Sequence, residues 1–85
     1  MAVQLLYFAW VREAIGRDGE RVELPGDITD VAGLIGWLAM RGGGYATAFA
    51  EPQRLRCAID QNFAGLATPI AGAREIAIFP PVTGG

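Results

Sequence analysis

One segment near the middle of the chain has the periodicity of a single long amphipathic helix, and it constrains the fold more than any other feature. Its apolar residues recur at intervals of three and four, which places them on one helical face: Val31, Leu34, Ile35, Leu38 and Ala39. Thr29 or Asp30 can cap the first turn, and the glycines at 42–44 end the helix near Arg41. Such a face must be buried, so the rest of the chain has to supply a surface that covers it.

Short β-prone segments lie on both sides of this helix and can supply that surface. Residues 3–8, 21–24, 55–60 and 75–79 have the composition and alternation of strands, and a short helix over 9–15 ends at Gly16. A helical turn at 45–50 and an extended piece beginning at Phe63 complete the order. We therefore predict an α+β fold in which a mixed sheet packs on one main helix, with residues 1–79 as a single domain and 80–85 as an extended tail.

The composition excludes several kinds of active site. All seven basic residues are arginine, and the sequence of 85 residues contains neither lysine nor histidine. The commonest general base and metal ligand is therefore missing, as is the amine needed for Schiff-base chemistry or for accepting an isopeptide bond. The scattered carboxylates Glu13, Asp30, Asp60 and Glu75 are most simply solvated or capping residues. We expect no metal site, no bound cofactor and no self-contained catalysis.

Charge and cysteine content bear on partners and location. The net charge is −2 and only Arg54 and Arg56 approach a basic cluster, so the chain is not expected to bind nucleic acid. Cys57 is the only cysteine, which fits a reducing compartment, and the strand alternation turns it inward. The opening apolar run lacks a basic leader and is too short to span a bilayer. We expect a cytoplasmic protein without a membrane partner.

The sequence FPPVTGG at positions 79–85 follows directly from the last predicted strand. Pro80 and Pro81 cannot continue a sheet ladder and favour an extended path, so they direct the chain away from the domain. The residues from Pro80 to Gly85 could reach at most about 20 Å. Gly84 and Gly85 have no side chains and could pass through a channel too narrow for other residues. The reactive group would then be the terminal carboxyl, which must be activated, for example by adenylation, before a sulfur or amine nucleophile can take the acyl group.

Three stretches together resemble the small, sulfur-carrying subunit of molybdopterin synthase: the ending EIAIFPPVTGG (75–85), the start LLYFAWVREAIG (5–16) and the middle segment AIDQ (58–61). The resemblance spans essentially the whole chain and implies the ubiquitin-like β-grasp fold. It also implies that an ATP-dependent, ubiquitin-activating-like adenylyltransferase adenylates Gly85, and that sulfur transfer then makes a thiocarboxylate. Val82 and Thr83 would belong, with the two prolines and Gly84, to the tail that carries this group.

The same resemblance implies how such a carrier is used. Its tail would enter the active site of the large synthase subunit, in a heterotetramer, and donate sulfur to cyclic pyranopterin monophosphate to form the dithiolene of molybdopterin. The large subunit would supply the catalytic lysine and arginines, so this chain would be a non-catalytic sulfur donor. Docking should use apolar surface near the tail, and Phe8, Phe63 and Phe79 are the candidates. The alternative for each of the three is an ordinary core position.

Other functions remain open at the level of sequence. A carrier of the same fold could serve the synthesis of thiamine thiazole or of cysteine, because such carriers share the Gly-Gly ending and differ elsewhere. A ubiquitin-like modifier would form isopeptide bonds to lysines of its targets, whereas a plain binding module would work with its tail blocked. An independent enzyme would have only the scattered carboxylates to offer.

Overall fold

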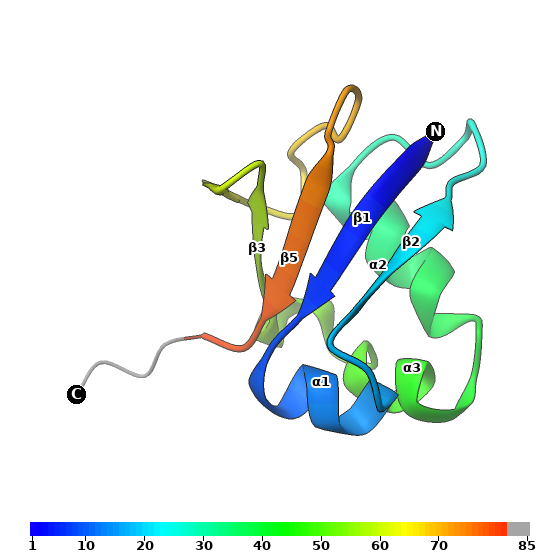
Figure 1. Ribbon diagram of the computed structural model, residues 1–85, viewed down its shortest axis with the longest axis vertical. Helices are drawn as coiled ribbons and strands as arrows, with labels where there is room; N and C mark the ends of the chain where they lie inside the picture. Colours follow the sequence, from blue (N-terminus) through cyan, green and yellow to red (C-terminus); the bar gives the residue numbers. More distant parts are fainter. Residues whose placement is uncertain (82–85) are drawn as a thin grey trace.

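The computed structural model describes residues 1–81, which form a five-stranded mixed sheet with helices on one face (Figure 1). The strands are β1 (Ala2–Tyr7), β2 (Gly19–Glu23), β3 (Arg56–Ile59), β4 (Asn62–Ala64) and β5 (Glu75–Phe79). The helices are α1 (Ala9–Ile15), α2 (Val31–Ala39) and α3 (Gly43–Ala48), followed by a 3-10 helix, η1 (Pro52–Arg54). The predicted α+β class, with a mixed sheet packed on one main helix, is confirmed.

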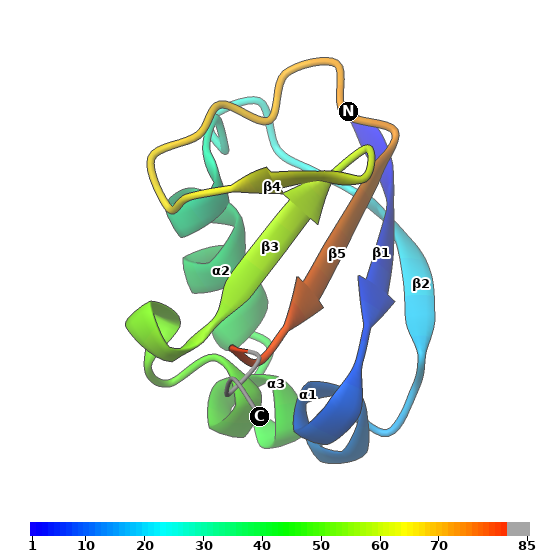
Figure 2. The same cartoon turned by 90° about the vertical axis from the view of Figure 1, so that its left-hand side faces the viewer.

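The last strand lies in the middle of the sheet, whose order is β2-β1-β5-β3-β4 (Figures 1 and 2). β5 runs parallel to β1, while the other neighbouring pairs are antiparallel. Because a central strand is hydrogen-bonded on both sides, the segment that leads into the tail starts from a fixed position.

One face of the sheet packs on α2 and forms the hydrophobic core. Alternation along β1 places Val3, Leu5 and Tyr7 on this face, and all three are fully buried, as are Ile76 and Ile78 of β5. Four of the five apolar positions predicted for the main helix are also fully buried: Val31, Leu34, Ile35 and Leu38. The fifth, Ala39, is partly buried at the edge of this core. Alternation in the strands and helical periodicity therefore identified both sides of the core.

The end of α2 differs from the prediction because the glycines at 42–44 do more than stop a helix. α2 ends at Ala39 rather than near Arg41, and α3 covers 43–48 rather than 45–50. Gly42 has a φ of 77°, which lets the chain reverse and begin α3 at once. At Gly44 a Cβ atom would lie 1.9 Å from the carbonyl oxygen of Ala14, so only glycine allows α3 to approach α1 this closely.

The strand boundaries also shift by one or two residues. β1 ends at Tyr7 rather than Phe8, because Phe8 becomes the N-cap residue of α1. β2 begins at Gly19 rather than Arg21, since its pairing with β1 extends to the Leu6–Gly19 pair. β3 spans 56–59 rather than 55–60, and β5 and α1 have the predicted bounds.

Within residues 1–81, the structure has no helix with the length and apolar content needed to cross a membrane.

Candidate functional site

The end of β5 is the point at which the predicted tail begins. Phe79 is the last residue of that strand, and Pro80 and Pro81 follow outside any regular element. The backbone N–H of Phe8 donates to the carbonyl of Ile78 at 3.3 Å, which joins the start of α1 to the end of β5. The predicted tail residues Val82, Thr83, Gly84 and Gly85 lie outside the described residues. What the structure defines is therefore the root of the tail.

Two of the three predicted docking residues form an aromatic pair at this root. The rings of Phe63 and Phe79 have centroids 6.2 Å apart and planes at 60°, an edge-to-face arrangement. Their strands are separated by β3, where Ala58 is the register partner of both Phe63 and Ala77. The small side chain of Ala58 leaves room for the two rings to meet above β3.

All three phenylalanines are accessible to different degrees. Phe63 is 87% exposed and Phe8 is 45% exposed, while Phe79 is partly buried. Phe8 lies at the same end of the sheet through its backbone bond to Ile78. None of the three belongs to the buried core, although that remained the alternative at the level of sequence. We call Phe8, Phe63 and Phe79 the tail-root patch.

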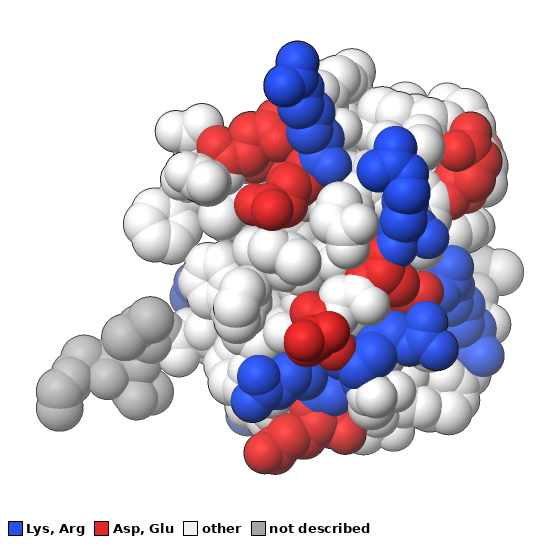
Figure 3. All heavy atoms as spheres, viewed as in Figure 1, with Lys and Arg blue, Asp and Glu red and all other residues white. Residues whose placement is uncertain are grey.

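The tail-root patch overlaps a larger surface, the sheet face opposite α2, which we call the open face. Strand alternation places on it Ala2, Gln4, Leu6, Gly19, Arg21, Glu23, Arg56, Ala58, Phe63, Glu75, Ala77 and Phe79. Within residues 1–81 the helices lie on the other side of the sheet (Figures 1 and 2). Figure 3 looks onto this side of the molecule, where uncharged side chains extend toward the root of the tail and charged ones lie mainly around them. An apolar area with a charged margin is typical of a protein-binding surface.

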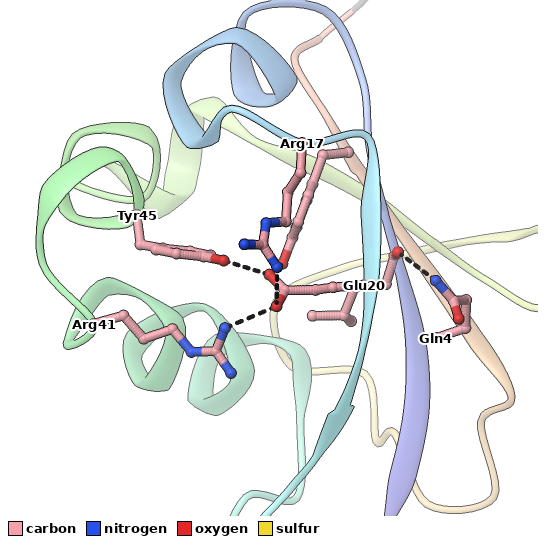
Figure 4. Close-up of polar contacts among 7 residues, drawn as sticks. Gln4, Arg17, Glu20, Arg41 and Tyr45 are labelled. Atoms are coloured by element: carbon pink, nitrogen blue, oxygen red, sulfur yellow. Dashed lines mark hydrogen bonds and ion pairs between the residues drawn. The ribbon is translucent and has the colours of Figure 1, made fainter.

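A polar cluster around Glu20 lies on the side of the sheet opposite the open face, and sequence reasoning missed it (Figure 4). The Glu20 carboxylate accepts hydrogen bonds from the hydroxyls of Tyr7, at 2.9 Å, and Tyr45, and pairs with Arg41 at 3.0 Å and Arg17 at 3.3 Å. The Arg41 guanidinium also lies over the rings of Trp37, 4.9 Å from the centroid, and Tyr45, at 5.1 Å. The sequence held no signal for this cluster, because Tyr7, Glu20 and Arg41 are far apart along the chain and meet only through tertiary packing.

The cluster shifts the ionisation of its members in opposite directions. Burial, reinforced by the hydrogen bond to Glu20, raises the pKa of Tyr7. Burial alone would raise the pKa of Glu20, but the hydrogen bonds from Tyr45, Tyr7 and Arg41 outweigh it and lower that pKa. Glu20 is therefore a stable carboxylate that ties β2 to β1, the end of α2 and α3. Such a group is suited to holding the fold, not to moving protons.

The carboxylates that the sequence interpreted as capping or solvated residues behave in that way. Asp30 caps α2 by accepting from the backbone N–H of Gly33 at 2.8 Å. Asp60 accepts from the backbone N–H groups of Arg74, at 3.1 Å, and Glu75, at 3.0 Å, which joins the β3–β4 turn to the start of β5. Glu13 is exposed on α1. Among residues 1–81, no group of histidine, cysteine or carboxylate side chains could hold a metal ion.

Cys57 points into the core as the alternation predicted. It is 2% exposed, and burial raises the pKa of its thiol to about 11. The described part of the chain thus has no activated nucleophile. What it offers chemically is an exposed aromatic patch at the root of a tail, supported by a strand that is paired on both sides.

Comparison with known proteins agrees with this geometry. Residues 5–85 match the model of the ThiS family. The molybdopterin synthase sulfur carrier subunit of Escherichia coli K12 is 35% identical over 83 residues, which cover 98% of this chain and 99% of that protein. The protein of the same description from Haemophilus influenzae is 37% identical, again over 98% of this chain and 99% of its own length.

A solved structure has the same architecture. A crystal structure of small archaeal modifier protein 1 from Haloferax volcanii matches with a TM-score of 0.61 and 25% identity, over 95% of this chain and 98% of that one. The structural match covers nearly the whole length of both chains. The chain therefore belongs to the ThiS family and has the ubiquitin-like β-grasp fold that the sequence predicted.

Proposed function

We propose that this protein is the sulfur carrier subunit of a molybdopterin synthase. The proposal rests above all on its similarity, over almost its full length, to sulfur carrier subunits of that enzyme. The family match extends to residue 85, so the Gly-Gly pair lies within the matched region. The geometry supports the same function, because an aromatic patch with exposed Phe8 and Phe63 lies at the end of β5, the last strand.

The carrier works through the carboxyl group of Gly85. An adenylyltransferase of the ubiquitin-activating kind uses ATP to convert this carboxylate to an acyl adenylate and releases pyrophosphate. A persulfide then displaces AMP, and cleavage of the new S–S bond by a thiol leaves a thiocarboxylate on Gly85. ATP is thus a substrate of the activating enzyme, and this chain holds no resident cofactor.

The large synthase subunit accepts the charged carrier. The tail-root patch docks on that subunit, so that Pro80, Pro81, Val82, Thr83 and Gly84 lead Gly85 into its active site. Sulfur passes there to cyclic pyranopterin monophosphate, on the way to the dithiolene of molybdopterin. The catalytic lysine and arginines belong to the large subunit, and two copies of each subunit form a heterotetramer.

The direct test is the mass of the intact chain after incubation with ATP, a sulfur source and the activating enzyme of the same organism. We expect a gain equal to the replacement of one oxygen by sulfur. A variant that lacks Gly85 is the control and should gain nothing. If the full chain gains no mass while the enzyme is active on an established substrate, the proposal is wrong.

A ubiquitin-like modifier is the second candidate, and the likeness to small archaeal modifier protein 1 favours it. A modifier would transfer the activated glycine to lysine amines of other proteins instead of exchanging oxygen for sulfur. Incubation of the activated chain with a lysate of its host, followed by peptide analysis for glycine-modified lysines, separates the two. As a sulfur carrier, the chain should yield thiocarboxylate and few such conjugates.

A further inference from the structure

The chain is poor in groups that could react with an activated carboxyl group. Its sequence contains no lysine, histidine or serine, and every basic residue is arginine. This matters for a protein that carries an acyl group, because an amine or thiol of its own surface can attack that group and consume it. The guanidinium of arginine stays protonated at any physiological pH and has no lone pair to offer as a nucleophile.

The single thiol is close to the tail root along the sheet but is turned away from it. Cys57 is the register partner of Ile78 on β5, one residue before the strand ends at Phe79. Its side chain faces α2 and is 2% exposed. Burial also raises its pKa to about 11, so the reactive thiolate is scarce at neutral pH.

Several other potential nucleophiles are held by hydrogen bonds. Tyr7 and Tyr45 both donate their phenolic hydroxyls to the Glu20 carboxylate. The hydroxyl of Thr47 donates to the carbonyl of Gly43. The α-amino group of Met1 donates to Glu23 at 3.2 Å and to the carbonyl of Leu24 at 3.1 Å, at the far end of β1 from the tail root.

Arg56 is the cationic residue placed nearest to the tail root in the sheet. It is the register partner of Phe79 on the open face. Its guanidinium donates to the carbonyls of Leu55, at 2.9 Å, and Gln53, at 3.2 Å. Position 56 lies beside the residue that precedes the tail, and a span of about 20 Å is the upper limit for six extended residues. An amine at this position would therefore meet an activated Gly85 at high effective concentration.

We propose that arginine at position 56 is a specificity-determining residue: it supplies positive charge beside the tail root without an amine that could take the acyl group. The acyl group is thereby reserved for an external nucleophile. The inference rests on the proposed function, in which Gly85 becomes an activated acyl donor. In the competing reaction, a lysine amine would attack the carbonyl carbon, the activating group would leave and take up the proton, and an amide would close a ring.

The test does not depend on the activating enzyme. The chain is prepared with Gly85 as a thioester of 2-mercaptoethanesulfonate and held at pH 8.5, and its intact mass is followed over time. Hydrolysis returns the mass of the parent acid, whereas self-acylation gives the parent mass minus one water. Three chains are compared: the wild type, Arg56→Lys and Arg21→Lys. Arg21→Lys is the matched control. Arg21 of β2 is the register partner of Gln4 on β1, and Gln4 is the register partner of Glu75, the first residue of β5. Arg21 is therefore level with the start of β5, whereas the tail follows its end.

We expect the wild type to hydrolyse without losing water. Arg56→Lys should lose water at least about tenfold faster than Arg21→Lys, in line with the effective concentrations of short flexible tethers. Circular dichroism should show all three chains folded at the assay temperature, with a slightly lower thermal midpoint for Arg56→Lys because the guanidinium hydrogen bonds to Leu55 and Gln53 are lost. Peptide mapping should find the new amide between Lys at position 56 and Gly85.

Either of two results would overturn the inference. One is self-acylation of the wild type at the rate of Arg56→Lys, which would mean that Met1, Cys57 or a hydroxyl is competent after all. The other is an Arg56→Lys chain that only hydrolyses. Neither result touches the proposed function, which is decided separately by the gain of sulfur with ATP and the activating enzyme.

Discussion

The two faces of β5 show how one strand serves two purposes. Ile76 and Ile78 point toward α2 and are fully buried, whereas Ala77 and Phe79 point to the open face and are only partly buried. The first pair removes apolar surface from water within the molecule and so stabilises the fold. The second pair, with Phe63, leaves apolar surface in water, which is favourable only when a partner covers it. Stability and recognition are thus separated by the alternation of a single strand.

The buried face should give the largest effect on stability. Ile78→Ala removes a fully buried side chain and leaves a cavity, so we expect the free energy of unfolding to fall by about 2–5 kcal/mol. Urea denaturation followed by circular dichroism measures this change. Ala77→Ser on the opposite face is the matched control and should change stability by less than about 0.5 kcal/mol. Equal losses in the two variants would contradict the separation of the faces.

A substitution on the open face should weaken partner binding and leave stability unchanged. Phe79→Asp places a charge in the tail-root patch, and we expect it to abolish binding to the large synthase subunit, a loss of at least about 2–4 kcal/mol for a central contact. The fold should stay intact, with an unchanged circular dichroism spectrum. Calorimetric titration with the large subunit measures the binding.

Met40→Asp is the control for that experiment. Met40 is 85% exposed at the end of α2, away from the open face, so a charge there should leave binding unchanged. If Phe79→Asp binds as tightly as the wild type, the tail-root patch is not the docking surface. If Met40→Asp also loses binding, the partner contacts a different or larger part of the molecule.

The Glu20 cluster is a second structural region that can be compared with the open face. Glu20→Gln removes the negative charge that Tyr7, Tyr45 and Arg41 share, and we expect the free energy of unfolding to fall by about 1–3 kcal/mol at pH 7. Binding to the large subunit should be retained, because the cluster lies on the side of the sheet opposite the open face. Loss of binding without loss of stability would show that this end also meets the partner.

The same carboxylate predicts a dependence on pH. Its pKa is lower in the folded than in the unfolded chain, so its stabilising contribution is complete above the unfolded value of about 4.3 and is lost as pH falls through the folded value. The stability difference between the wild type and Glu20→Gln should therefore shrink as pH falls from 7 toward 3. A constant difference over this range would mean that the carboxylate is not shifted.

The turn between β3 and β4 should give the smallest effect. Asp60 and Gln61 have φ angles of 48° and 73°, a region that costs most residues about 1 kcal/mol or more. We expect Gln61→Gly to raise the free energy of unfolding by about 0.5 kcal/mol, the net of relieved strain and the entropy of glycine. Asp60→Gly should instead destabilise, because it removes the carboxylate that accepts from Arg74 and Glu75.

Much of the architecture followed from local sequence. The inward residues of β1, four of the five apolar positions of α2, the bounds of α1 and β5, and the Asp30 cap are all set by alternation, periodicity and capping within a few residues. The predicted ends of helices and strands were wrong where a tertiary contact determines the end. The clearest example is Gly44, whose place inside α3 depends on its contact with Ala14 of α1.

The candidate site divides in the same way. The sequence by itself determined which reactive side chains the chain lacks and, through strand parity, that Phe79 lies opposite the inward Ile76 and Ile78, because composition and parity are local properties. Only the tertiary structure decided that Phe63 meets Phe79 across β3, that Arg56 lies beside Phe79, and that Glu20 gathers two tyrosines and two arginines. These contacts join residues distant in sequence, and strand order and register, which no local pattern encodes, bring them together.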